Sequence, residues 1–291
     1  MIPVSGGAQT YWDDLARSYW MLESPLRPTG EELLSTQQVA MRHAALRPAG
    51  PFRALLLGVT PDLARMQWPE NTKLFAVDHS FPMVKVVWPG NIPEVRHAIC
   101  GDWLAMPLAD SSCNLAIGDG SMNCVRYPDG FRKVAASVAR ALRPDGLLVL
   151  RCYAQLEQKE DPDRVLASLS KGDMPSFHYF KFRLLMALQE DAREGVAVAD
   201  VYRCWVRSGI DPARLAASRG WDPATIRTLD LYRDSSTVHT FPTLAECRSV
   251  LREYFDEVSC SYASFPLAER CPMLVLKPIP DAKASGSRRG N

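Results

Sequence analysis

Three aspartates stand at or just beyond the ends of short apolar runs, where a carboxylate can accept hydrogen bonds from sugar hydroxyls or an exocyclic amine. They are Asp78, Asp102 and Asp119. Asp78 also follows Gly58 by 20 residues, the spacing at which an acidic residue meets a nucleoside ribose in nucleotide-binding sheets. A single aspartate could simply cap a turn. Three at successive run ends favour a binding site.

The loop that begins at Gly58 limits the class of ligand. A dinucleotide site needs the pattern G-x-G-x-x-G so that the backbone can approach a pyrophosphate. Here the loop reads Gly-Val-Thr-Pro-Asp, with one glycine and with Asp62 in the first helical turn. Because Asp62 would repel a pyrophosphate at that helix start, the loop better suits a ligand without phosphates.

The elements that must position these residues alternate between strands and helices. Short apolar runs at 53–57, 73–77, 95–99, 114–117 and 147–150 are separated by helical patterns. Such alternation predicts a parallel sheet covered on both faces, with ligands bound beyond the carboxyl ends of the strands. The residues at those ends are Gly58, Thr60, Pro61, Asp78, His79, Gly101, Asp102, Trp103, Asp119, Gly120 and Ser121.

The rest of the chain divides around this core. We expect a helical segment at 1–50, the first part of the core at 51–153, a mainly helical insertion at 154–240, the end of the core at 241–280 and a disordered tail at 281–291. Capping boxes at Thr29 and Thr243 predict helices over 33–46 and 244–254. The insertion contains a helix around 177–189 and two more, and should cover the carboxyl edge of the sheet. Strands at 258–265 and 273–277 are joined too closely for a crossover and must be antiparallel.

Composition excludes several classes of protein. The chain has 291 residues, 47% of them apolar, and 34 basic residues nearly cancel 33 acidic ones for a net charge of +1. This balance argues against a nucleic-acid partner, because proteins that hold nucleic acid mainly through its phosphates are usually strongly basic. The eight cysteines form no CxxC pair, which predicts reduced thiols and no metal site. Without a long apolar run, we expect no membrane association, and a cytoplasmic monomer or homodimer.

Residues 54–152 resemble the class I S-adenosylmethionine-dependent methyltransferases. The segment Leu142-Arg-Pro-Asp-Gly146 resembles the turn before the fifth strand of that family, and the C-terminal hairpin matches its reversed last strand. The resemblance implies a Rossmann-like, seven-stranded, mostly parallel α/β sheet with an antiparallel last strand. It also implies S-adenosylmethionine as cofactor and S-adenosylhomocysteine as product.

The resemblance also implies roles for individual residues. Gly58 and its loop, with Thr60 and Pro61, would lie along the methionine, and Asp78 would bind both ribose hydroxyls. His79 and Met83 would flank the adenine, Asp102 would take its amino group, and Trp103 would pack nearby. Gly101, directly before Asp102, is also expected to bind the cofactor. The methyl group would emerge near Asp119, Gly120 and Ser121.

The sequence departs from the family in its first loop. Leu56 stands where an acid is usual, and Val59-Thr60 replaces further glycines. This leaves open how the methionine amino group is held. Tyr11, Arg17 and Tyr19 are candidates to supply contacts from the N-terminal segment, or alternatively to pack that segment onto the sheet.

The expected reaction is in-line methyl transfer to a nitrogen or oxygen of a small-molecule acceptor. Because the cofactor activates its own methyl group, a general base is optional; His178 and His239 are the candidates. The segment 119–123 lacks the Asn-Pro-Pro-Tyr motif of adenine- and glutamine-modifying members. The alternatives are a protein or RNA methyltransferase and a scaffold without catalysis. Candidate acceptor-pocket residues in the insertion are His178, Tyr179, Arg183, Tyr202, Arg203, Trp205, Tyr232, Arg233 and His239.

Overall fold

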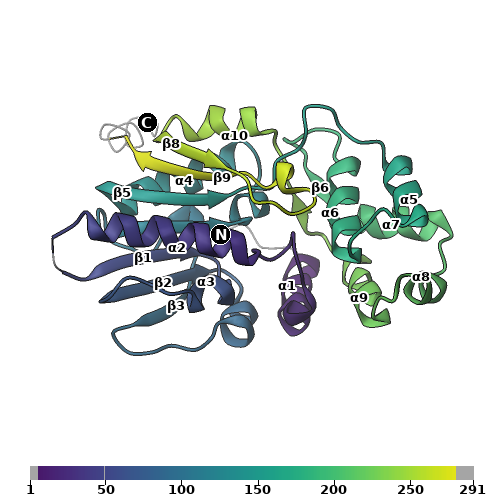
Figure 1. The fold of residues 1–291 in the computed structure, drawn as a ribbon, viewed down its shortest axis with the longest axis horizontal. Coiled ribbons are helices and arrows are strands. Elements are labelled where there is room, and N and C mark those ends of the chain that lie inside the picture. Colours follow the sequence, from purple (N-terminus) through teal and green to yellow (C-terminus); the bar gives the residue numbers. More distant parts are fainter. Residues whose placement is uncertain (1–5, 49, 280–291) are drawn as a thin grey trace.

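A seven-stranded sheet forms the centre of the molecule (Figure 1). The computed structural model describes residues 6–48 and 50–279, with the side chains of 6–10 excepted; the tail predicted at 281–291 lies outside them. The sheet order is β3-β2-β1-β4-β5-β9-β8, and β9 is antiparallel to both neighbours. The predicted Rossmann-like sheet with its antiparallel last strand is therefore confirmed. The strands are β1 (Phe52–Leu57), β2 (Thr72–Asp78), β3 (Arg96–Cys100), β4 (Cys113–Asp119), β5 (Leu142–Arg151), β8 (Phe255–Ser261) and β9 (Met273–Pro278).

Two strands, β5 and β8, differ from their predicted ranges by more than two residues. Strand β5 begins at Leu142 rather than at 147, because Leu142 pairs with Cys113 before a register shift. Strand β8 covers Phe255–Ser261 rather than 258–265, because its register against β9 begins with Phe255 opposite Pro278. In both cases pairing with a neighbouring strand, rather than local hydrophobicity, sets the boundary.

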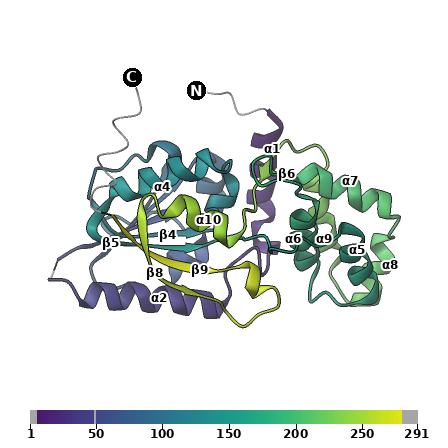
Figure 2. The same ribbon diagram turned by 90° about the horizontal axis from the view of Figure 1, so that it is seen from above.

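Both faces of the sheet are buried, and this explains why the residues of β1 form a continuous apolar run: its side chains point alternately into two cores. Leu55 and Leu57 point into the core beneath α4 (Asp129–Ala141) and α10 (Leu244–Leu251). Ala54 and Leu56 point into the opposite core. That core is covered by α2 (Gly30–Ala45) and α3 (Pro61–Arg65), and Figure 2 shows α2 on one side of the sheet with α4 and α10 on the other.

The two predicted capping boxes are present. Thr29 and Glu32 cap α2, and Thr243 and Glu246 cap α10. Helix α10 ends at Leu251, before the predicted 254. Ahead of α2, the chain forms α1 (Gly6–Ser18) and the short helix η1 (Tyr19–Met21).

The predicted insertion contains more helices than expected and builds a hydrophobic core of its own, which we call the cap core. Proline at the first helical position and an aspartate cap precede three of the helices, at Asp161, Asp211 and Asp222. The cap elements are α5 (Pro162–Lys171), α6 (Phe177–Leu188), α7 (Val198–Ser208), α8 (Pro212–Arg219), α9 (Pro223–Arg227), η5 (Thr228–Tyr232), and a two-stranded ribbon of β6 (Val196–Ala197) and β7 (Val238–His239).

Helix α1 stands between the sheet and the cap helices in both views (Figures 1 and 2). Tyr11 of α1 belongs to the cap core, whereas Ala16 of the same helix belongs to the core under α2. Helix α1 therefore links the two parts. None of the helices in the described ranges has the length and apolarity needed to cross a membrane.

Candidate functional site

A cavity lies at the carboxyl ends of β1, β2 and β4, between the sheet, α1 and the cap. It contains about 1210 Å³ of space free of protein atoms, its open mouth included. Strands β1 and β4 are neighbours in the sheet, and on either side of them the strand order runs in opposite directions. Ligands of open α/β sheets bind at such a switch point. The cavity is thus where sheet geometry expects a ligand.

Asp78 and Gly58 form the sheet side of the cavity. Asp78 is buried, and its Oδ1 accepts a hydrogen bond of 2.9 Å from the Ser80 amide. Burial raises the pKa of Asp78. Gly58 has a φ of +100°, and a Cβ placed there would lie 3.7 Å from the Trp103 ring and 3.8 Å from Asp78 Oδ2. The missing side chain therefore leaves free space between a carboxylate oxygen and an aromatic ring.

Asp119 lines the same cavity, but Arg151 already binds its carboxylate. Arg151 Nε donates to Asp119 Oδ1 at 2.5 Å, and its Nη1 donates to Glu32 Oε1 at 3.1 Å. All three side chains are buried or nearly so. This network ties α2 to the ends of β4 and β5. Asp119 therefore has a structural function whatever the ligand.

Gly120 determines where Tyr153 lies against the cavity. Its φ is +61°, and a Cβ there would come within 2.5 Å of the Tyr153 ring. The Tyr153 hydroxyl donates to the Pro25 carbonyl at 3.1 Å and accepts from Arg151 at the same distance. Two hydrogen bonds thus hold the hydroxyl end of the ring. Only glycine gives this close approach without displacing the ring.

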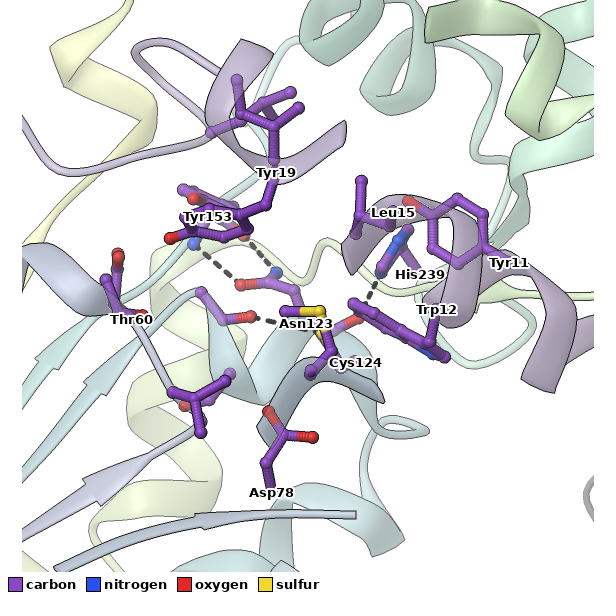
Figure 3. A pocket seen from close by; sticks show the side chains of 18 of the residues that line it. Tyr11, Trp12, Leu15, Tyr19, Thr60, Asp78, Asn123, Cys124, Tyr153 and His239 are labelled. Atoms are coloured by element: carbon purple, nitrogen blue, oxygen red, sulfur yellow. Dashed lines mark hydrogen bonds between the residues drawn. The ribbon is translucent and has the colours of Figure 1, made fainter. Parts of the chain in front are cut away.

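The N-terminal segment closes one side of the cavity, as Figure 3 shows for Tyr11, Trp12, Leu15 and Tyr19. The Trp12 ring lies 6.3 Å from the His79 ring and 6.4 Å from the His239 ring, so it spans the gap between sheet and cap. Arg17, the third residue expected here, does not line the cavity; it is exposed and pairs with Asp14.

The two candidate histidines have different surroundings. His239 lines the cavity, and its Nδ1–H donates to the Asn123 carbonyl at 3.3 Å, which leaves the lone pair on Nε2. Burial lowers the pKa of His239. His178 is fully buried beside η1, where its Nε2–H donates to the Met21 carbonyl at 2.8 Å, and it does not line the cavity. Burial lowers the pKa of His178 to about 3.

Three of the predicted cofactor residues do not line the cavity. Pro61 is buried at the start of α3, and Gly101 faces Pro107. Asp102 is exposed, and its carboxylate caps the short helix η3 (Trp103–Ala105) by accepting from the Leu104 amide at 2.9 Å. The predicted residues that do line the cavity are Gly58, Thr60, Asp78, His79, Met83, Trp103, Asp119, Gly120 and Ser121.

Of the candidates in the insertion, Tyr232 and His239 line the cavity and the other seven do not. Arg183 pairs with Glu160, and Trp205 belongs to the cap core. Sequence reasoning missed several lining residues, among them Lys181. Its signal was present: within the apolar helix α6, Lys181 and Arg183 are the only lysine and arginine. Other missed lining residues include Trp12, Leu15, Asn123, Cys124, Tyr153, Phe182, Leu185, Thr228, Leu231 and Phe241.

The described ranges contain no group of three or more His, Cys, Asp or Glu side chains placed to hold a metal ion. The cysteine thiols of the described residues form no disulfide bonds.

Comparison with known proteins shows the fold. No protein-family model matches the chain, and no curated protein matches it. A Rhodobacter sphaeroides structure, named as a candidate Zn-dependent alcohol dehydrogenase, is 12% identical; the match covers 95% of this chain and all (100%) of that one, with a TM-score of 0.62.

Two further similar structures are methyltransferases by name. One is the Burkholderia thailandensis 1,6-didemethyltoxoflavin-N1-methyltransferase with bound S-adenosylhomocysteine (12% identity, 96% and 92% coverage, TM-score 0.48). The other is the N-methyltransferase NodS of Bradyrhizobium japonicum, also with S-adenosylhomocysteine (12% identity, 93% and 98% coverage, TM-score 0.48). Of the three likenesses, the one with a TM-score of 0.62 shows a shared fold, and at 12% identity it shows nothing beyond the fold.

Proposed function

We propose that this protein transfers a methyl group from S-adenosylmethionine to a small-molecule acceptor. The observation that carries the proposal is Asp78, a buried carboxylate at the end of β2 that faces the space left open by Gly58. A carboxylate at this place can accept hydrogen bonds from ribose hydroxyls. The aromatic ring of Trp103 on the other side of that space suits a flat base.

The sheet and the first loop favour a nucleoside over a dinucleotide. In dinucleotide-binding sheets of order 3-2-1-4-5-6 the sixth strand follows the fifth. Here the reversed strand β9 lies between β5 and β8. The single glycine of the first loop and the acid at Asp62, which pairs with Arg27, offer no cradle for a pyrophosphate.

The chain's own residues would hold the cofactor along the carboxyl edge. Asp78 would bind the ribose, His79 and Met83 would flank the adenine, and Tyr19 with Thr60 would meet the methionine part. Leu56 is buried in the core under α2, so no acid of β1 reaches the amino group. The chemistry supplied by the bound cofactor is an activated methyl group on a sulfonium, which leaves S-adenosylhomocysteine as product.

In this proposal His239 takes a proton from the acceptor. Its Nδ1–H is bound to a carbonyl, its Nε2 carries the lone pair, and its lowered pKa keeps the ring neutral near pH 7. A base in this state can accept a proton as the new bond to carbon forms. Trp12 and Tyr11 pack edge to face beside the ring.

Enclosure by α1 and the cap supports a small acceptor. Aromatic and aliphatic side chains form most of the cavity wall, which is typical of sites for small organic molecules. A macromolecular acceptor would need an open groove instead.

Calorimetric titration with S-adenosylmethionine and S-adenosylhomocysteine tests the proposal, with NADH as a counter-probe. We expect binding of the first two and none of NADH. Asp78→Asn keeps the size of the side chain and should weaken cofactor binding by about 1–3 kcal/mol, or roughly 5- to 150-fold. Asp129→Asn, at an exposed aspartate, is the control. Absence of binding at millimolar cofactor, or unchanged affinity in Asp78→Asn, would refute the assignment.

A further inference from the structure

Lys181 is a buried cation on the wall of the cavity. It lies on α6 of the cap, is 1% exposed, and lines the cavity together with Thr228 and Tyr232 of η5. Neither the fold nor the proposed cofactor site accounts for it. A lysine is almost never this deeply buried unless it is paired.

The contacts of Lys181 leave most of its ammonium group unsatisfied. Its Nζ donates one hydrogen bond, of 2.7 Å, to Thr228 Oγ1. The Thr228 hydroxyl in turn donates to the Thr225 carbonyl at 2.6 Å, so its lone pair is oriented toward Lys181. The Nζ also lies 5.4 Å from the centre of the Tyr232 ring. An ammonium has three N–H donors, and within the described ranges the other two have no hydrogen-bond acceptor.

The other buried cations show what is missing at Lys181. Arg151 is bound by Asp119 and Glu32, and Arg270 is bound by Glu160. No ion pair of the described residues involves Lys181. Its burial without a carboxylate lowers the pKa of Lys181 to about 7. A buried charge is stabilised by an opposite charge, and the cavity that Lys181 lines has room for one.

We propose that Lys181 is the anchor for a carboxylate of the acceptor, whose apolar body packs against the aromatic wall of the cavity. As a statement about the acceptor, this rests on the proposed methyl transfer. The carboxylate oxygens would accept hydrogen bonds from the two free N–H groups of the ammonium, and the third N–H would keep its hydrogen bond to Thr228. Phe182, Phe241 and Tyr232 provide flat apolar surfaces for a planar acid; the first two rings lie 6.3 Å apart, edge to face.

The neighbours of Lys181 favour an anion over a proton-transfer function. His178, one helical turn earlier, is neutral near pH 7, partly because of the Lys181 charge itself. Tyr11 and Tyr232 are also neutral, since burial raises the pKa of both. Lys181 therefore faces hydrogen-bonding groups without negative charge, and a bound carboxylate would be its first counter-ion. If Lys181 instead acted as a base, its amine would be uncharged, and a bound carboxylate would not stabilise it.

The test compares matched acids and amides as probes. Calorimetry at about pH 6.5 measures benzoate against benzamide and 2-naphthoate against 2-naphthamide, with wild type, Lys181→Met and the control Lys171→Met, an exposed lysine of the same cap. We expect wild type and Lys171→Met to prefer each acid at least about tenfold, and Lys181→Met to lose that preference. Equal binding of acid and amide by wild type, a preference that survives in Lys181→Met, or no binding of either acid would overturn the proposal.

A second measurement uses wild type alone, in case Lys181→Met does not fold. The titration of the Lys181 ammonium is followed by NMR with and without 2-naphthoate. We expect its midpoint to rise by at least about one pH unit on binding, because an anion stabilises the charged form; a midpoint that stays or falls contradicts the anchor. Cofactor calorimetry is independent of both arms. Acid preference without cofactor binding would refute the methyltransferase proposal only. Cofactor binding without acid preference would refute the anchor only.

Discussion

Replacing Lys181 by methionine should raise the stability of the protein, and the gain should depend on pH in a defined way. The pKa of Lys181 is lowered from its usual 10.5 to about 7 by burial. A lowered lysine pKa means that the unfolded chain binds the proton more tightly, so wild-type stability increases with pH across this interval. The loss of folding stability caused by burying the charged ammonium is fully present below about pH 7 and disappears above about pH 10.5. Methionine has a similar length and carries no charge.

The magnitude follows from the difference between the two pKa values. At about 1.4 kcal/mol per pH unit, a displacement from 10.5 to about 7 corresponds to about 5 kcal/mol at low pH. Between pH 7 and pH 9 the folded chain loses this proton while the unfolded chain keeps it. The stability advantage of Lys181→Met should therefore shrink by about 2–3 kcal/mol over these two pH units.

The assay is denaturant unfolding of both proteins at half-unit steps from about pH 7 to pH 9. The quantity compared is the unfolding free energy of Lys181→Met minus that of wild type, plotted against pH. Packing changes caused by methionine do not vary with pH, so they shift this whole difference curve without changing its slope. His178 titrates below this window, since its pKa is lowered to about 3, and does not contribute. Lys171→Met, at an exposed site, should give a flat difference curve. A flat curve for Lys181→Met as well would mean that Lys181 is solvated or paired in the native state, and would refute the reasoning.

Two further predictions concern packing and charge around the cavity. Gly120→Ala should cost about 2–4 kcal/mol of stability, because the new Cβ meets the Tyr153 ring at 2.5 Å in addition to the strain of a positive φ. Gly209→Ala has nearly the same φ, +65°, with open space around it, so denaturant unfolding should show only about 1–2 kcal/mol; equal losses would exclude the clash. Arg151→Met leaves two buried carboxylates without their partner and should cost about 3–5 kcal/mol, whereas Arg248→Met at an exposed ion pair should cost at most about 1 kcal/mol. Comparable losses in these two arginine variants would show that burial does not strengthen the Arg151 network.

The sequence was most informative where local rules decide the structure. The run at 53–57 predicted β1 because both faces of a parallel strand are buried, and Leu55 and Leu56 indeed enter different cores. Thr29 and Thr243 predicted helix starts because a hydroxyl and a glutamate three residues later satisfy free amides wherever the helix lies.

Prediction was weaker where distant segments decide the outcome. Asp102 and Asp119 looked alike in sequence, each at a strand end. In the structure Asp102 caps a turn in solvent, and Asp119 binds Arg151. The extents of β5 and β8 depended on their partner strands, and the number of cap helices exceeded the estimate.

The sequence by itself determined the succession of strands and helices along the core, the helix caps and the edge of the sheet where the cavity lies, because hydrophobic periodicity and capping act within a few residues. Only the tertiary structure decided which polar groups face the cavity. Whether Lys181 meets a carboxylate or empty space depends on residues far away in the chain, on η5, α1 and the sheet. Burial and pairing, which set the charge state of such a group, are properties of that assembled environment.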